Sequence, residues 1–100
     1  MTSRAAQAAV ALKAREFLYE PKALTAPPGA VVFVVRNEGA IEHNFVLEDA
    51  VAKKVVEIAV IEPGATAEVA ATLFPGAYTI VCTLPGHRQA GMVATLTVAK

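Results

Sequence analysis

Four residues of types that bind soft metals occur in the order His43, Cys82, His87 and Met92. The last three lie within eleven residues, and a Pro-Gly turn separates the cysteine from the second histidine. Thiolate sulfur suits copper(I), imidazole suits copper(II), and a long thioether contact completes a site that rearranges little between the two oxidation states. The set therefore predicts one mononuclear copper ion that is held by these four side chains and transfers single electrons.

The residue counts argue against other metal centres and against catalysis. Zinc prefers a closed tetrahedron of histidine and cysteine and rarely recruits methionine, and iron–sulfur clusters need more thiolates than the single cysteine supplies. Two histidines are too few for a trinuclear copper cluster or a second, catalytic copper. We therefore expect no enzymatic activity. A copper carrier or store, which would use the same ligands without redox cycling, stays an alternative.

The elements that must position these ligands are strands. From Val10 onward, short segments rich in Val, Ile, Thr and Phe alternate with Gly and Pro turns, and their apolar residues recur with a period of two. We expect strands over 30–36, 43–47, 55–60, 65–73, 77–82 and 92–99. Seven or eight strands at this spacing predict an all-β fold, a Greek-key β-sandwich. The polar segment 48–54 predicts a short helix or a long loop.

The same alternation predicts which side chains point into the sandwich. Each candidate ligand on a strand shares its face with apolar neighbours: Cys82 with Tyr78 and Ile80, Met92 with Leu96 and Val98, and His43 with Phe45 and Leu47. In the segment 55–60 the inward set is Val56, Ile58 and Val60. One end of the sandwich can therefore gather all four ligands. We expect His43 to be buried and His87, in the turn, to lie at the surface with one ring edge toward solvent.

Length and composition set the remaining bounds. One hundred residues make one domain, for which we expect residues 10–100, with residues 1–9 as a loose tail or an extra turn of helix. Nine basic and nine acidic residues cancel, so a nucleic-acid partner is not expected. No apolar run reaches the length of a membrane span. The single cysteine excludes an internal disulfide framework, and no secretory leader is visible.

The segment from Tyr78 to His87, followed by Ala90-Gly91-Met92 and a closing strand, resembles the copper loop of the cupredoxins. These are the small type 1 blue copper proteins that include azurins, plastocyanins and auracyanins. The Asn37-Glu38-Gly39 turn before His43 is similar to the part of the family that donates the first histidine. The Cys-to-His spacing resembles azurin and the His-to-Met spacing plastocyanin, so no subfamily is assigned. The resemblance implies a thiolate as the strongest ligand and a methionine as the axial one.

Residues next to the ligands also follow from the resemblance. It implies that the amide of Asn44 points at the Cys82 sulfur and that the Asn44 side chain bonds the Thr83 region. Pro85 has no N–H to offer, whereas the amide of Leu84 can donate a further hydrogen bond to the sulfur. Such hydrogen bonds stabilise the thiolate charge and raise the reduction potential.

The surface around His87 is expected to be apolar. Its candidate docking residues are Ala40, Ile41, Pro85, Gly86 and Ala90. Electron-transfer encounters bury little area and dissociate quickly, so this patch suits transient complexes of a monomer with redox proteins such as a cytochrome or an oxidase. The family resemblance implies a periplasmic or other extracytoplasmic location. The copper domain of a larger, membrane-anchored respiratory protein is a further alternative.

Overall fold

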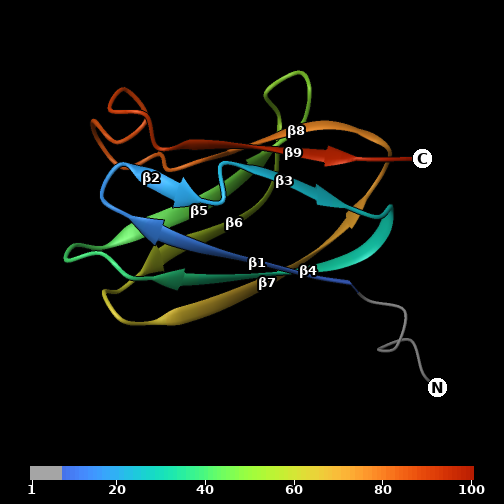
Figure 1. The fold of residues 1–100 in the computed structure, drawn as a ribbon. Coiled ribbons are helices and arrows are strands. Elements are labelled where there is room, and N and C mark those ends of the chain that lie inside the picture. The colour runs from blue at the N-terminus through green and yellow to red at the C-terminus, as the bar shows by residue number, and fades with distance from the viewer. Residues whose placement is uncertain (1–7) are drawn as a thin grey trace.

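The computed structural model describes residues 8–100, which form nine strands in two packed sheets (Figure 1). The strands are β1 (Ala8–Arg15), β2 (Leu18–Glu20), β3 (Ala23–Ala26), β4 (Gly29–Asn37), β5 (His43–Glu48), β6 (Lys54–Ile61), β7 (Thr66–Leu73), β8 (Gly76–Val81) and β9 (Val93–Val98). No helix that could cross a membrane occurs among these residues. The all-β sandwich expected from the sequence is confirmed.

The two sheets are mixed. One has the strand order β2-β1-β4-β7, with β1 and β4 parallel, and the other has the order β3-β9-β8-β5-β6, with β3 and β9 parallel. The strands β5 and β8 are neighbours although β6 and β7 lie between them in the chain and β7 belongs to the opposite sheet. This is a crossover of the Greek-key type. It brings the strand that begins at His43 beside the strand that leads to Cys82.

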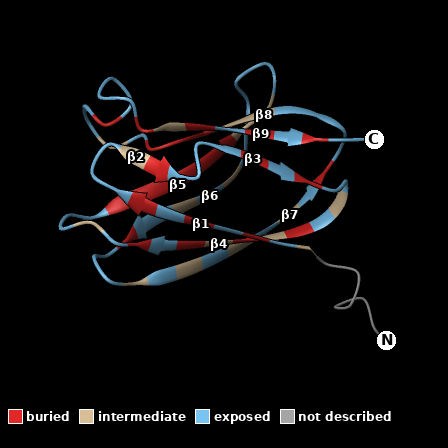
Figure 2. Cartoon of the chain, viewed as in Figure 1, coloured by how far each residue is buried: buried red, intermediate tan, exposed pale blue. Residues whose placement is uncertain are grey.

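The core lies between the sheets, as the red bands of Figure 2 show. The strand β4 is central, and its Val31, Phe33 and Val35 are fully buried. Phe33 packs against Phe45 of the opposite sheet, with ring centroids 5.1 Å apart. The inward faces predicted for Cys82, Met92 and His43 are confirmed, because all three side chains are fully buried.

Two expectations about the amino-terminal part are corrected. Nine strands are present in the described chain rather than seven or eight, because the segment 18–26 forms two short strands that belong to different sheets. Pro21, which has no N–H for a sheet ladder, lies between them. The strand β1 begins at Ala8, so residues 8 and 9 belong to the sheet rather than to a tail. The rest of the predicted tail lies outside the described residues.

The short helix considered for the segment 48–54 is not formed; a tight loop joins β5 to β6 instead. The Asp49 carboxylate accepts hydrogen bonds from the amides of Val51 and Lys53, at 3.0 Å and 2.9 Å. Such a turn competes directly with helix hydrogen bonding. Ala52 adopts a φ of 64°, which an α-helix does not permit.

The inward position predicted for Val60 is also wrong. Between the pairs Phe45–Ile58 and His43–Ile61 the register of β5 and β6 shifts. An extra residue in one strand reverses the alternation beyond it, so Ile61 is buried and Val60 is about half exposed, at 51%. This irregularity sits where β5 begins at His43.

Candidate metal centre

The loop that joins β8 to β9, residues 82–92, is closed by its own backbone hydrogen bonds. The amide of Cys82 donates to the carbonyl of Met92 at 3.2 Å, and the amide of Met92 donates to the carbonyl of His87 at 3.1 Å. The amide of His87 donates to the carbonyl of Leu84 at 3.1 Å. These bonds fix the backbone positions of three candidate ligands relative to one another, independently of a metal.

The loop between β4 and β5 is held by Asn37, which is fully buried. Its side-chain amide donates to the carbonyls of Ile41 and Ile61 at 2.9 Å and 2.8 Å, and its side-chain oxygen accepts from the amide of Gly39 at 2.8 Å. The turn predicted around Asn37 is therefore built by an asparagine side chain that mimics backbone. It delivers the chain to His43 in a fixed position.

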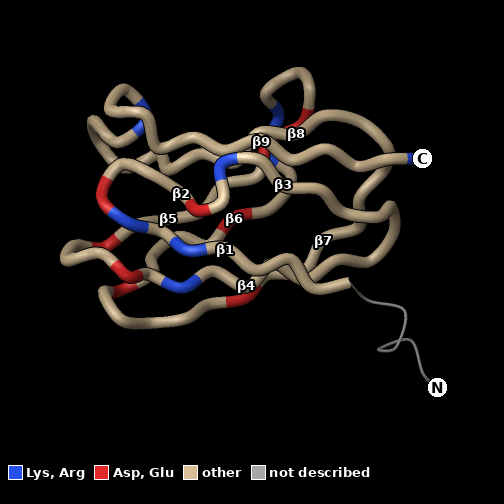
Figure 3. Tube along the Cα trace, viewed as in Figure 1, with Lys and Arg blue, Asp and Glu red and all other residues tan. Residues whose placement is uncertain are grey.

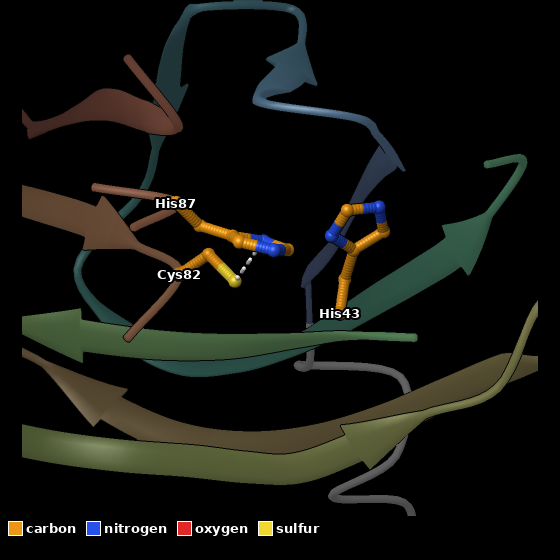
Figure 4. Close-up of side chains that lie close together, drawn as sticks. All are labelled: His43, Cys82 and His87. Carbon is orange, nitrogen blue, oxygen red and sulfur yellow. Dashed lines mark hydrogen bonds between the residues drawn. The ribbon is translucent and has the colours of Figure 1, made fainter. Parts of the chain in front are cut away.

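Three ligand atoms meet at this end of the sandwich (Figure 4). One nitrogen of His43, the sulfur of Cys82 and one nitrogen of His87 all lie within 4.8 Å of one another. Cys82 Sγ is 3.4 Å from His87 Nδ1, and the two imidazole centroids are 5.2 Å apart. All three residues are buried. The sequence thus predicted a group of side chains that the fold does bring together.

The ring nitrogens of His43 have different partners. Nε2 lies 3.1 Å from Oε1 of Glu16, whose carboxylate can only accept while it is ionised, so this nitrogen carries the proton. Nδ1 is the one buried side-chain nitrogen or oxygen of residues 8–100 that has no hydrogen-bond partner. Figure 4 shows one ring nitrogen of His43 facing Cys82 and His87. A lone pair kept bare in this place is suited to a metal ion.

Met92 completes the set that the sequence predicted. Its side chain is fully buried and belongs to the same core cluster as Cys82, and its backbone is bonded to both Cys82 and His87. Two imidazoles and a thiolate with a thioether in the same loop fit copper better than zinc. The role of Met92 as the axial ligand stays a prediction.

Asn44 connects the two segments that carry the ligands. Its side-chain nitrogen donates to Thr83 Oγ1 at 2.8 Å, and its side-chain oxygen accepts from the amide of Thr83 at 2.9 Å. The link between Asn44 and the Thr83 region is therefore confirmed. Leu84 is half-buried and Pro85 is exposed. The hydrogen bonds predicted from the amides of Asn44 and Leu84 to the sulfur stay predictions.

Tyr19 adds a second anchor behind Asn44. Its hydroxyl donates to the Asn44 carbonyl at 2.6 Å, and its side chain is fully buried. Burial, together with the negative charge of a nearby Cys82 thiolate, raises the pKa of Tyr19 well above its usual value of 10. The phenol therefore remains a neutral donor at neutral pH.

His87 is less exposed than the sequence predicted, because only 8% of the residue is accessible to solvent. That one edge of its ring faces solvent stays a prediction. The Phe17 ring packs against the His87 ring in a T-shaped arrangement, with centroids 5.2 Å apart and planes at 83°. The predicted docking residues Ala40, Ile41, Pro85, Gly86 and Ala90 are all exposed.

Sequence reasoning missed Glu16 and the contact of Phe17 with His87. Their turn, between β1 and β2, contains no Gly, Pro, Asn or Asp, so composition does not reveal it. One signal was available, because Val10, Leu12 and Ala14 face inward and the same period assigns the next inward position to the charged Glu16. An acidic residue in such a position indicates either that the strand ends there or that the carboxylate has a polar partner in the protein interior.

A β-sandwich that gathers a buried cysteine sulfur and two imidazole nitrogens within 4.8 Å of one another has the architecture of a small mononuclear metal-binding domain. Residues 6–99 match the model of the copper binding proteins of the plastocyanin/azurin family. The chain therefore belongs to the plastocyanin/azurin family of copper-binding proteins.

Solved structures share the fold. The chain superimposes on reduced auracyanin from the photosynthetic bacterium Roseiflexus castenholzii with a TM-score of 0.82 and 22% identity, over 92% of this chain and 97% of that one. Auracyanin B gives 0.83 and 24%, over 95% and 90%. Auracyanin A from Chloroflexus aurantiacus, described as a "blue" copper protein, gives 0.82 and 20%, over 92% and 98%. No curated protein sequence matches the chain.

Proposed function

We propose that this protein carries single electrons on one copper ion held by His43, Cys82, His87 and Met92. The observation that supports this most directly is the unpartnered, buried Nδ1 of His43, which lies within 4.8 Å of the ligand atoms of Cys82 and His87. Membership of the plastocyanin/azurin family supports the same metal. Copper bound there supplies a one-electron couple between copper(I) and copper(II).

The chain's own residues keep the site the same in both oxidation states. The backbone bonds of the loop 82–92 and the link from Asn44 to Thr83 hold the ligand atoms in place. Burial of Cys82 and Met92 keeps water away from the sulfur ligands. A site that need not rearrange exchanges electrons with little reorganisation, and this is the property that a carrier needs.

The exposed residues around the site form the proposed docking surface for redox proteins. We define this surface as Ala40, Ile41, Pro85, Gly86 and Ala90 together with the exposed Phe17 ring. Arg88 is the one charged residue among residues 82–92, and its guanidinium pairs with Glu48 at 3.1 Å. The tube of the loop that joins β8 to β9 is accordingly mostly tan in Figure 3. An apolar surface with little free charge suits brief encounters with weak long-range steering.

Substitutions in the docking surface test this part of the proposal. We expect Ala40→Glu and Ala90→Glu each to slow electron exchange with a redox partner severalfold, since a charge would be desolvated on docking. Ala50→Glu is the matched control, because Ala50 is exposed in the β5–β6 loop and the net charge changes equally. Equal rates in all three variants would contradict the proposed surface.

A copper carrier or store is the second candidate, because the same ligands bind copper without cycling it. Reversible redox titration separates the two functions. An electron carrier should pass repeatedly between the two oxidation states and retain its metal when a partner protein is present. A carrier of copper should instead lose the metal to an acceptor protein and need not cycle.

We propose no enzymatic role. The described residues contain one group of three histidine, cysteine or acidic ligands close enough to hold a metal, and it is the site above. Catalytic turnover of a small substrate, in which more than one equivalent is oxidised or reduced per copper, would contradict this proposal.

A periplasmic or other extracytoplasmic location is also part of the proposed function and is supported by the family alone.

A further inference from the structure

The connection between β1 and β2 is a two-residue turn, Glu16-Phe17, and each residue contacts a different histidine. The carboxylate of Glu16 lies 3.1 Å from Nε2 of His43. The ring of Phe17 packs edge-on against the ring of His87. A single turn, distant in sequence from both histidines, therefore touches both imidazoles.

The position of Glu16 is fixed on several sides. Its Oε1 also accepts a hydrogen bond from the amide of Ala40 at 2.9 Å. Gly39 lies against the same group, because a Cβ at this position would overlap the Glu16 carboxylate and come within 3.0 Å of His43 Nε2. The absence of a side chain at position 39 leaves the space that the carboxylate needs to reach His43.

Phe17 is held in an unusual backbone conformation. Its φ of 64° lies in the left-handed region, which is unfavourable for a bulky residue and marks a position that the surrounding structure enforces. The conformation directs the ring onto His87. The carbonyl of Phe17 lies 3.9 Å from the Cβ position of Gly91, so the turn also packs against the loop that carries Met92.

We propose that Glu16 and Phe17 are positioning residues for the two histidine ligands, an inference that rests on the copper site proposed above. Glu16 accepts the proton of Nε2 and so fixes His43 in the tautomer that offers Nδ1 to the metal. Its negative charge makes the ring a stronger donor, which stabilises copper(II) more than copper(I). Phe17 holds the ring of His87 and covers it from water.

Two substitutions of Glu16 separate its charge from its hydrogen bonds. In Glu16→Gln the amide oxygen can still accept from both Nε2 and the amide of Ala40, but the charge is gone. We expect the Cu(II)-to-Cu(I) affinity ratio to fall about tenfold, which raises the reduction potential by about 59 mV. In Glu16→Ala the hydrogen bonds are lost as well, and we expect copper(II) affinity to fall about 10- to 100-fold.

Glu68→Gln is the matched control for charge, because Glu68 is exposed on β7 and its replacement changes the net charge by the same amount. It should leave the reduction potential unchanged. If Glu16→Gln shifts the potential no more than Glu68→Gln, and Glu16→Ala keeps the wild-type copper affinity, the role assigned to Glu16 is refuted.

The His43 tautomer can be read without copper, by ¹⁵N NMR of the imidazole nitrogens in the metal-free protein at neutral pH. We expect Nε2–H alone in the wild type and in Glu16→Gln, and a mixture of the two tautomers in Glu16→Ala. A mixture in the wild type would overturn the inference even if copper binds. A protein that binds no copper but keeps Nε2–H would overturn the proposed function and leave this contact established.

For Phe17 the informative comparison is among alanine, glycine and leucine. Phe17→Ala and Phe17→Gly both remove the ring, and glycine also relieves the backbone strain. We expect both variants to release copper to a chelator severalfold faster than the wild type. Of the two, Phe17→Gly should have the higher free energy of unfolding. Phe17→Leu should restore much of the wild-type release rate. Wild-type release from Phe17→Ala and Phe17→Gly would contradict the covering role.

Discussion

Replacing Asn44 by alanine should speed the release of copper from its site and lower the free energy of unfolding of the protein. The substitution removes the two hydrogen bonds to Thr83, at 2.8 Å and 2.9 Å. Each such bond contributes about 1 kcal/mol to stability. Thr83 is exposed, so water can take the place of the Asn44 side chain as its hydrogen-bond partner. The substitution therefore carries no further penalty for a buried polar group without a partner. We therefore expect a loss of about 2 kcal/mol in the free energy of unfolding of the metal-free protein.

Urea unfolding measures this loss, and for a domain of this size about 2 kcal/mol lowers the thermal midpoint by about 8–16 °C. Thr83→Ser keeps both hydrogen bonds and should behave like the wild type. A double-mutant cycle of Asn44→Ala with Thr83→Ala isolates the direct contact, for which we expect a coupling free energy of about 1 kcal/mol.

The same variant tests whether this link matters for the metal. The ligand-bearing segments are His43 on β5 and the loop 82–92, and Asn44 joins them by side-chain hydrogen bonds. We expect Asn44→Ala to lose copper to a chelator faster than Thr83→Ser does, with a shifted absorption spectrum. An unchanged release rate, spectrum and reduction potential in Asn44→Ala would refute the reasoning, whatever the stability shows.

Three further substitutions have outcomes that the structure defines. Gly39→Ala should weaken copper(II) binding and lower the thermal midpoint, because its Cβ would displace the Glu16 carboxylate from His43. Adding Glu16→Ala should restore part of the midpoint but not the affinity, because the Cβ would still lie 3.0 Å from His43 Nε2. Tyr19 has a pKa raised by burial, so its contribution to stability is complete below the unfolded pKa, about 10, and declines above it by about 1.4 kcal/mol per pH unit. Urea unfolding of Tyr19→Phe between pH 9 and 11 should lack this part of the decline. Asp49→Ala should lower the free energy of unfolding by about 1–2 kcal/mol, because two hydrogen bonds of the turn are lost. It should leave copper affinity unchanged. A changed copper affinity in Asp49→Ala would contradict the separation of the β5–β6 loop from the metal site.

The parts of the site that could be predicted from the sequence are those encoded locally. Cys82, His87 and Met92 lie in one loop, and the period-two pattern of the flanking strands fixes which way Cys82 and Met92 face. His43 could be added because its own strand repeats that pattern. The sandwich followed from the same alternation together with Gly and Pro turns.

The parts that could not be predicted depend on contacts between distant segments. Glu16 reaches His43 across 27 positions of sequence, and nothing local to either residue indicates it. His87 was expected at the surface because it follows a Pro-Gly turn, but only 8% of it is exposed, and its contact with Phe17 spans 70 positions of sequence. The position of Val60 depended on a shift in register between two strands, which arises from their pairing and not from either sequence alone.

Titration of the purified protein with copper(II), followed by absorption and electron paramagnetic resonance, is the most direct test of a mononuclear site with Cys82 as its thiolate ligand. One equivalent of copper per chain should produce an intense blue or green colour from thiolate-to-copper charge transfer and an unusually small copper hyperfine splitting. Cys82→Ser should abolish the colour. A colourless wild-type protein, or an intense colour that survives in Cys82→Ser, would contradict the proposed site.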